Sequence, residues 1–498
     1  MGPGIMTRTV SIASLMETSG VKFGTSGARG LVRAMTDEVC FAYTSAFLQY
    51  LESQGRLGPH SRVALAGDLR SSTGRILAAV THAVVQRGHE PVACGRIPSP
   101  AVALYGLDQR IPAIMVTGSH IPDDRNGIKF NSADGEILKA DELGIRSQVV
   151  SLPDDFDSAG MLVAGAAVAG PPVDPAAARL FVRRWRDAFA PDALAGLRLG
   201  VYGHSAVGRD LLVEVYSALG ADIVQLGYSG RFIPVDTEAI RQEDVDLAAR
   251  WCPELGLDAI VSTDGDSDRP LISDEHGRWL RGDVAGILCA QYLKADVVVA
   301  PISCNTALEA SGAFARVIRT RIGSPYVIEA MMNAVQEGGR RVVGYEANGG
   351  FLTASALAPE GRELARLPTR DAMLVHLGIL RRAVVENKAV SALLAQLPPR
   401  YTASDRLQEF PTELSHRRLA DLQRGGAIAM EAAFPESFGK VRGIDTLDGL
   451  RVTFANGDIV HLRASGNAPE LRCYTESASD ERARALNAET LRVLESWR

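Results

Sequence analysis

Predicted strands and helices alternate along most of this chain, and that alternation limits its fold more than any other feature. Residues 62–68 and 91–95 read as buried strands on either side of a helix over residues 73–86, and residues 111–116 read as a third strand. A strand–helix–strand order at this spacing is typical of βαβ units in a buried sheet. The same order returns twice further along the chain, over residues 176–262 and 284–345.

The last part of the chain follows a different pattern. Two apolar strands at residues 450–454 and 459–462 flank Asn456-Gly457, a dipeptide that strongly indicates a β-hairpin. A further strand at 471–476 and a closing helix over 480–497 complete an α+β unit. At roughly 100–200 residues per domain, 498 residues suggest three or four domains. We therefore predict three α/β domains followed by one smaller α+β domain.

Two segments have the composition of linkers between these domains. Residues 164–175 are rich in Ala, Gly and Pro, and residues 395–405 read as a second linker. Residues 1–20 read as a loose leader with no signal-peptide core. The predicted domains are 1–170, 171–283, 284–397 and 398–498.

Composition and charge exclude several classes of protein. Lys and Arg number 53 and Asp and Glu 59, so the net charge of −6 argues against a general nucleic-acid binder. No apolar run approaches the ~20 residues that span a bilayer, so we expect no membrane partner. The six cysteines are scattered and form no CxxC pair, which is typical of free thiols in a reducing compartment. A cytoplasmic location is therefore expected.

The loop at residues 117–122 is the first of four that could carry chemistry. It follows an apolar strand, and ligands of open α/β sheets collect at the carboxyl ends of strands. Ser119 would expose its hydroxyl on such a turn, and Gly118 would let the backbone approach a ligand. His120 and Lys129 lie nearby in sequence and could act as acid, base or counter-charge. The alternative is a plain turn in which Ser119 bonds to the backbone.

The second loop contains Asp264, Asp266 and Asp268, three carboxylates that repel one another unless a cation neutralises them. Hard oxygen ligands of this kind suit Mg²⁺. An EF-hand calcium loop also begins D-x-D-x-D, but it needs glycine at its sixth position, where this chain has Arg269. A solvated acidic turn is the remaining alternative.

The third and fourth loops have residue types that suit sugar and phosphate. Glu346 and Asn348 follow a predicted strand and offer the acceptors and donors that sugar hydroxyls need. The fourth loop combines an arginine, a hydroxyl, a free backbone N–H and an amide, which together suit a phosphate. Ordinary turns remain an equal alternative for each segment. The residues of the fourth loop are Arg463, Ser465, Gly466 and Asn467, with Arg472 close in sequence.

Taken in this order, the loops resemble the motifs of the α-D-phosphohexomutase family. FGTSGARG begins at Phe23, TGSHIPDDRNGIKF resembles the family's catalytic serine loop, and DGDSDR resembles its magnesium loop. GYEANGG resembles the sugar-specificity loop, and RASGNAPELRCYTES resembles the phosphate-binding loop. The resemblance covers nearly the whole chain. It implies mixed sheets in the three α/β domains and a central cleft between all four domains.

The resemblance also implies roles for individual residues. Ser119 would carry the transferable phosphate, and it would share Mg²⁺ with the three aspartates. Lys129 and His120 would be the general acid/base and its neighbour, while Arg29 and Arg269 would stabilise charge at the phosphoserine. The sugar hydroxyls would meet Glu346 and Asn348. The phosphate that is not being transferred would be held by Arg463, Ser465, Gly466 and Asn467.

The implied reaction interconverts a hexose 6-phosphate and a hexose 1-phosphate through a hexose 1,6-bisphosphate, which is both intermediate and activator. Mannose phosphate is the favoured substrate, glucose phosphate the next and glucosamine phosphate the least. Two other classes stay open, namely a sugar-phosphate-binding protein without turnover and a phosphatase that loses the phosphoserine to water. A monomer or a homodimer is expected.

The sequence departs from the family pattern mainly in its substrate loops. Ile121 replaces the usual Asn of the serine loop, and Asn348 replaces the usual Ser of the sugar loop. Gly350 and Ser324 stand where many members have histidine. Asn467 stands at the first position of the usual Thr-Glu pair of the phosphate-binding loop, and the second position differs as well. Since the catalytic and metal-binding residues are intact, these departures bear on which sugar is bound.

Overall fold

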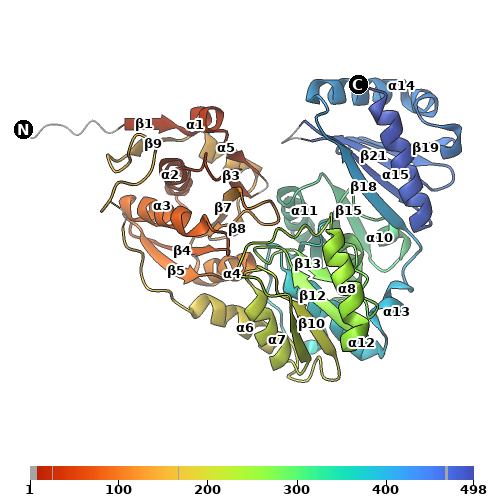
Figure 1. The fold of residues 1–498 in the computed structure, drawn as a ribbon, viewed down its shortest axis with the longest axis horizontal. Helices are drawn as coiled ribbons and strands as arrows, with labels where there is room; N and C mark the ends of the chain where they lie inside the picture. The colour runs from red at the N-terminus through yellow and green to blue at the C-terminus, as the bar shows by residue number, and fades with distance from the viewer. Residues whose placement is uncertain (1–7, 25, 167, 466–468) are drawn as a thin grey trace, which may run out of the picture.

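The structure is a computed structural model that describes residues 8–498 apart from residues 25, 167 and 466–468. Three mixed sheets and one five-stranded antiparallel sheet follow one another along the chain, each with its own helices, and a small two-stranded antiparallel sheet lies beside the first (Figure 1). The units built on the larger sheets are called the first to fourth domains below. The predicted series of three α/β domains and one α+β domain is therefore confirmed.

The first domain is built on seven strands in the order β2-β3-β7-β6-β4-β5, with β8 beside β7. Strands β4, β5 and β6 are parallel, whereas β7 runs antiparallel to both β6 and β3. The strands are β2 (Lys22–Phe23), β3 (Gly27–Leu31), β4 (Arg62–Gly67), β5 (Glu90–Gly95), β6 (Ala113–Val116), β7 (Arg125–Ser132) and β8 (Gly135–Glu136). The helices are α2 (Asp37–Ser53), α3 (Thr73–Gln86), α4 (Ser99–Gln109) and α5 (Lys139–Arg146).

Strand β4 shows why the three parallel strands of this sheet are largely apolar. Val63 and Leu65 pack into the core beneath α2 and α3, whereas Ala64 and Ala66 point to the opposite face, against α4. Successive side chains of a strand alternate between faces, so a sheet covered by helices on both sides needs apolar residues at every position. This double burial explains the unbroken apolar runs in the sequence.

The second and third domains have the same topology, three parallel strands with a fourth, antiparallel strand at the edge. In the second domain the order is β11-β10-β12-β13, and in the third it is β15-β14-β16-β17. The second domain contains α6 (Ala176–Ala188), β10 (Arg198–Tyr202), α7 (Arg209–Ala218), β11 (Asp222–Leu226), α8 (Gln242–Leu255), β12 (Ala259–Thr263) and β13 (Pro270–Ile272). The third contains α9 (Gly282–Tyr292), β14 (Val297–Pro301), α10 (Ala307–Ala310), β15 (Arg316–Thr320), α11 (Ser324–Gln336), β16 (Val342–Tyr345), β17 (Phe351–Thr353), α12 (Ala372–Glu386) and α13 (Val390–Leu394).

The fourth domain is a five-stranded antiparallel sheet in the order β18-β22-β21-β20-β19, blue in Figure 1. The predicted hairpin at Asn456-Gly457 joins β20 to β21, with Gly457 at a positive φ of 88°. The elements are β18 (Tyr401–Leu407), α14 (Thr412–Ala433), β19 (Val441–Asp445), β20 (Leu450–Phe454), β21 (Ile459–Ala464), β22 (Leu471–Ser477) and α15 (Asp480–Glu495).

Buried apolar residues divide the molecule into two bodies. One core cluster continues from α4 through α6 and α7 to α9 and α12, so it joins the first three domains. The fourth domain has its own core, centred on Phe438 and Phe454. Polar contacts link it to the third domain, including the Thr306 N–H to Glu476 at 3.2 Å and the Ile322 N–H to Asp448 at 2.9 Å. An interface of this kind favours rigid-body motion of the fourth domain.

Two sequence-based expectations are wrong. Residues 401–405 are not linker but part of β18, which pairs with β22 along its whole length. The strand lies at the sheet edge and is largely exposed, so it lacks the apolar alternation of a buried strand. Residues 8–19 are not a loose leader, because β1 (Arg8–Ser11) pairs with β9 (Val149–Leu152) and α1 (Ile12–Ser19) buries Ile12. That pairing joins distant segments and leaves no local sequence signal.

All six cysteines are buried free thiols, as predicted. Among the residues that the structure describes, no helix combines the length and the apolar character needed to cross a membrane.

Separate cores predict separate effects of core mutations. Phe130 on β7 is fully buried and stacks on Phe47 with ring centroids 4.6 Å apart, so Phe130→Ala should destabilise the first domain by about 3–5 kcal/mol. Phe438→Ala is the matched change in the fourth domain, and it should destabilise that domain only. Hydrogen-exchange mass spectrometry checks both, and faster exchange in the first domain of Phe438→Ala would contradict the two-body description.

Candidate active site

The serine loop leaves the carboxyl end of β6 and holds Ser119 in an unusual conformation. Ser119 has a φ of 55°, in the left-handed region, and is 1% exposed. Its backbone N–H donates to Thr117 Oγ1 at 2.8 Å. Non-glycine residues at positive φ are uncommon and gather at functional sites. The loop is therefore shaped to present one hydroxyl at the sheet edge, and is more than a plain turn.

A buried ion pair shapes this loop, and sequence analysis missed it. Arg70 donates from Nε to Asp68 Oδ2 at 3.2 Å, and its guanidinium also donates to the carbonyls of Ser119, Ile121 and Pro122 at 2.5–2.8 Å. A Cβ on Gly118 would lie 2.6 Å from this guanidinium. Gly118 therefore makes room for Arg70 beneath the loop, not for a ligand above it. The signal in the sequence was Asp68, a carboxylate directly after a buried strand.

Strand β7 returns the chain to the serine and carries Lys129 with it. Lys129 pairs in register with Met115 on β6 and with Gly27 on β3, so its backbone lies at the centre of the sheet. Its Nζ donates to Asp266 Oδ2 and to Asp268 Oδ2, both at 2.5 Å. Burial lowers the pKa of Lys129, but these two carboxylates outweigh burial and raise it.

The aspartate loop follows β12 and meets the serine loop directly. Ser119 Oγ donates to Asp264 Oδ2 at 2.5 Å. Ser99, at the start of α4, donates from both its backbone N–H and its Oγ to Asp266. Two residues of the first domain, Ser119 and Ser99, therefore hold the aspartate loop of the second domain in place. The structure brings the two strongest motifs of the sequence together.

The three aspartates have the arrangement of a cation site. Their side chains are at most 1% exposed, and one carboxylate oxygen from each lies within 4.8 Å of the others. Asp266 Oδ1 and Asp268 Oδ1 are buried without a hydrogen-bond partner among the described residues. Burial and the neighbouring carboxylates raise the pKa of Asp264 well above its usual range. A divalent cation with oxygen ligands would satisfy the two free oxygens and relieve this repulsion.

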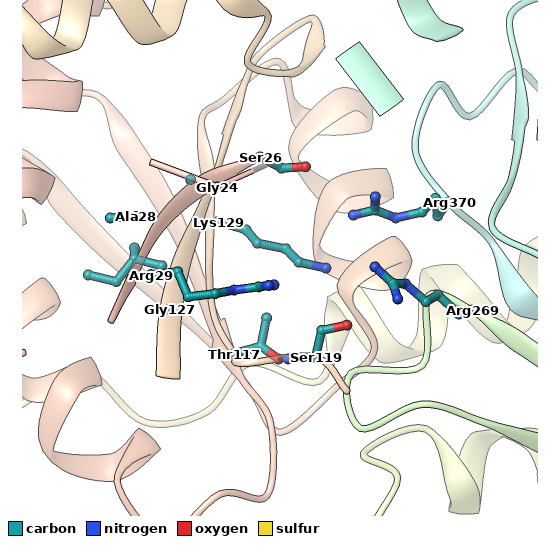
Figure 2. Close-up of a pocket in the computed structure, with 12 residues that line it drawn as sticks. Gly24, Ser26, Ala28, Arg29, Thr117, Ser119, Gly127, Lys129, Arg269 and Arg370 are labelled. Atoms are coloured by element: carbon teal, nitrogen blue, oxygen red, sulfur yellow. Dashed lines mark hydrogen bonds between the residues drawn. The ribbon is translucent and has the colours of Figure 1, made fainter. Parts of the chain in front are cut away.

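Cationic side chains surround the space beside Ser119 (Figure 2). Arg29 and Lys129 reach it from β3 and β7, Arg269 from the aspartate loop and Arg370 from the third domain. Burial and the charge of Arg269 lower the pKa of Arg29 to about 10, so it stays protonated. The described residues that line this pocket all come from the first three domains. Such a ring of positive charge suits a phosphoryl group.

His120 lies next to the serine, as predicted. Its Nδ1 is 3.3 Å from Ser119 Oγ. Burial, together with the charges of Arg269 and Arg29, lowers the pKa of His120 well below its usual range. The imidazole is therefore neutral at physiological pH. It can donate a hydrogen bond to the serine hydroxyl or accept one from it without adding charge to the site.

The sugar-loop candidates lie at the carboxyl end of β16. Glu346 is 5% exposed and accepts from Arg370 Nη1 at 3.2 Å. Asn348 accepts the Gly350 N–H at 2.9 Å through Oδ1, so its oxygen closes the loop's own turn. Arg370, which sequence analysis did not single out, joins this loop to the aspartate loop through Asp268, at 3.0 Å. Nothing in its local sequence separates Arg370 from an ordinary surface arginine.

The fourth loop lies in the other body of the molecule. Arg463 and Arg472 stand directly opposite each other on β21 and β22, and Arg463 donates to Asp448 at 3.0 Å. Arg472 Nη2 pairs with Glu470 at 3.7 Å, while its Nε is buried without a hydrogen-bond partner among the described residues. Ser465 is buried, and its backbone N–H donates to the Glu470 carbonyl at 2.9 Å. Gly466 and Asn467 lie outside the described residues.

Family models and known proteins match this chain along most of its length. The family models described as phosphoglucomutase/phosphomannomutase alpha/beta/alpha domain I, alpha/beta/alpha domain III and C-terminal domain match residues 20–152, 281–401 and 414–493. A phosphomannomutase of Sinorhizobium fredii is 42% identical, over 96% of this chain and 99% of its own. A phosphomannomutase of Salmonella muenchen is 41% identical, over 94% of each.

A more distant relative matches the chain in sequence, and a solved structure has the same fold. A phosphoglucosamine mutase of Sorangium cellulosum is 27% identical over 95% of this chain and 92% of its own. A phosphoglucomutase/phosphomannomutase family protein of Burkholderia thailandensis superposes with a TM-score of 0.71 at 18% identity, covering 98% of each chain. The chain therefore belongs to the phosphoglucomutase/phosphomannomutase family, the α-D-phosphohexomutases.

Proposed function

We propose that this protein is a phosphomannomutase that interconverts mannose 6-phosphate and mannose 1-phosphate through a phosphoserine and a 1,6-bisphosphate. One observation carries the proposal. The buried Ser119 hydroxyl donates to Asp264 while Arg29, Arg269 and Lys129 surround the space in front of it. A strained serine between a carboxylate cluster and a ring of cations suits a phosphate carrier.

The aspartate triplet is the proposed Mg²⁺ site, and the phosphate oxygens of a phosphorylated Ser119 would complete it. A cation there would neutralise charge on the phosphoryl group, the main electrostatic need of this reaction. The unpartnered oxygens of Asp266 and Asp268 support this assignment. The ion pairs of Lys129 with the same two aspartates hold its ammonium beside the phosphate position.

In the proposed transfer, the bond between Ser119 Oγ and phosphorus breaks as the sugar hydroxyl oxygen bonds to phosphorus. The Lys129 ammonium donates a proton to the departing Ser119 Oγ and takes the sugar hydroxyl proton in its place. Arg29 and Arg269 stabilise the charge of the phosphoryl group during its transfer. The reverse transfer from the other position of the bisphosphate restores the phosphoserine. Hexose 1,6-bisphosphate would therefore also activate unphosphorylated enzyme.

The fourth domain is proposed to hold the phosphate that is not transferred. Arg463, Arg472 and Ser465 would bind it, with Gly466 and Asn467 from the same loop. The separate core of this domain supports closure over a bound sugar phosphate and reopening while the bisphosphate turns. Glu346 and Asn348 would meet the sugar hydroxyls between the two phosphate positions.

Mannose is proposed because the relatives above 40% identity are phosphomannomutases. Coupled assays with mannose 1-phosphate, glucose 1-phosphate and glucosamine 1-phosphate, run side by side, test this choice. The highest kcat/KM for mannose 1-phosphate is expected. Preference for glucosamine 1-phosphate would instead agree with the phosphoglucosamine mutase relative at 27% identity. Release of free phosphate without isomerisation would indicate a phosphatase, and tight binding without either would indicate a binding protein.

Further parts of the proposal concern the whole molecule. We place the domain boundaries near residues 170, 283 and 397, and we propose a cytoplasmic monomer or homodimer. The buried free thiols support the reducing compartment.

Arg463→Ala should raise KM for the hexose phosphate by about tenfold to 100-fold, because charge-assisted bonds contribute about 1.5–3 kcal/mol. Phosphorylation of Ser119 should persist, since Arg463 lies outside the pocket around Ser119. Steady-state kinetics and intact mass measure the two effects. The control is Arg442→Ala, an exposed arginine of the same sheet. A normal KM with lost phosphoserine would show that the loop serves the other end of the substrate.

A further inference from the structure

Arg370 is the buried cation of the pocket whose role the proposed mechanism leaves open. It precedes α12 and is 3% exposed. Its Nε donates to Asp268 Oδ2 at 3.0 Å, and its Nη1 donates to Glu346 Oε2 at 3.2 Å. Arg370 therefore connects the aspartate loop with the sugar loop, and its guanidinium points into the same space as Arg29 and Arg269 (Figure 2).

The path of the Arg370 side chain depends on the absence of a side chain at Gly350. A Cβ on Gly350 would lie 2.4 Å from Arg370 Cδ and 2.6 Å from Cγ. Real Cβ atoms do not approach carbon so closely, so any other residue at 350 would displace the arginine. Ser324 is also in contact, since Arg370 Nη1 donates to its Oγ at 3.4 Å. The two departures from the family pattern at 350 and 324 thus surround a single arginine.

A second layer fixes the loop that carries Arg370. Glu136 of the first domain accepts from the neighbouring Thr369 at 2.5 Å, from Ser324 at 3.1 Å and from Ser26 at 2.8 Å. An arginine guanidinium is protonated throughout the physiological pH range, and Asp268 and Glu346 hold this one in a fixed position. A pre-organised, permanently charged fork is what a transferring phosphoryl group needs.

We propose that Arg370 is a further catalytic residue, which contacts the phosphoryl group between Ser119 and the sugar oxygen and reaches it only because residue 350 is glycine. The proposal rests on the phosphoserine mechanism proposed above. Arg370 neither donates nor removes a proton in that transfer. It stabilises the charge on the phosphoryl oxygens while one oxygen–phosphorus bond breaks and the other forms.

Rapid-quench transfer from phosphorylated enzyme to mannose 6-phosphate, or to the hexose phosphate preferred in the coupled assays, tests the proposal. Arg370→Ala should slow the single-turnover step by about 100-fold or more, as loss of one pre-organised donor does. KM should change far less, and the phosphoserine should persist longer. Arg370→Lys should recover only part of the rate, because lysine lacks the planar fork. Added guanidinium ion should partly restore Arg370→Ala.

A double-mutant cycle separates catalysis from structural support. Gly350→Ala alone should slow transfer by about 10- to 100-fold through displacement of Arg370. In the Arg370→Ala background, Gly350→Ala should slow transfer little further, since the arginine side chain that it displaces is already absent. Arg184→Ala is the matched control, because Arg184 is a buried arginine beside the neighbouring Asp371 that does not line the pocket. It should lower thermal stability and leave the transfer rate within severalfold.

The outcomes distinguish this inference from the proposed function. If wild-type enzyme carries a phosphoserine and isomerises sugar phosphates while Arg370→Ala transfers at the wild-type rate, the inference is wrong and the function stands. Additive effects of the two substitutions, or equal losses in Arg370→Ala and Arg184→Ala, would reduce Arg370 to a structural ion pair. If wild-type Ser119 never accepts phosphate from hexose 1,6-bisphosphate, the function and the inference fail together.

Discussion

Ser119→Ala is expected to abolish isomerisation, with a loss of about 10⁴-fold or more, because the proposed reaction passes through a covalent intermediate on this hydroxyl. The fold should be unaffected, since the substitution removes one buried oxygen whose donated bond goes to Asp264. Intact-mass analysis after incubation with hexose 1,6-bisphosphate should show a phosphate adduct on wild-type protein and none on the variant. Sugar phosphate should still bind, because the cationic ring remains.

Ser132→Ala provides the control for this experiment. Ser132 is also buried, lies on β7 with Lys129 and donates to the Gly135 carbonyl, but it does not line the pocket. Its substitution should leave turnover within severalfold and the phosphate adduct in place. Turnover of Ser119→Ala within tenfold of wild type would refute the phosphoserine mechanism. An adduct that survives in Ser119→Ala would place the phosphate on another residue.

The sequence predicted those parts of the site that are encoded in short segments. Ser119 and the aspartates lie on loops that directly follow buried strands, so local patterning was enough to place them at sheet edges. The shared layout of the second and third domains was predicted for the same reason. Inner strands such as β14 and β16 are apolar at nearly every position, which is the direct consequence of burial on both faces, whereas the edge strands β11 and β15 also carry polar residues.

Residues that act through distant contacts could not be predicted. Arg70 shapes the serine loop from a different strand–helix connection, and Arg370 reaches the pocket from the third domain. Glu136 joins hydroxyls of the first and third domains. Each looks like an ordinary polar residue in its own segment, because its partners are defined only once the domains pack together. The exposed edge strand β18 was not predicted for a related reason, since its stability comes from pairing with β22.

Removal of divalent cation should reduce turnover by about 10³-fold or more, and added Mg²⁺ should restore it. The three aspartates lie close together in a site with almost no solvent exposure. Lys129 pairs with Asp266 and Asp268 yet leaves one oxygen of each unsatisfied among the described residues. Loss of the cation would remove several kcal/mol of charge stabilisation from phosphoryl transfer. Exhaustive chelation followed by titration with Mg²⁺ measures the effect.

Asp266→Asn should reproduce the loss and weaken the response to Mg²⁺, because an amide is a poorer ligand for a hard cation than a carboxylate. Thermal denaturation gives a readout that does not depend on catalysis, since Mg²⁺ should stabilise wild-type protein more than the variant. Asp274→Asn is the matched control. Asp274 is a buried aspartate of the same domain whose carboxylate accepts backbone N–H groups outside the cluster. Full turnover after chelation, or an equal Mg²⁺ response in Asp266→Asn and wild type, would show that the triplet binds no catalytic cation.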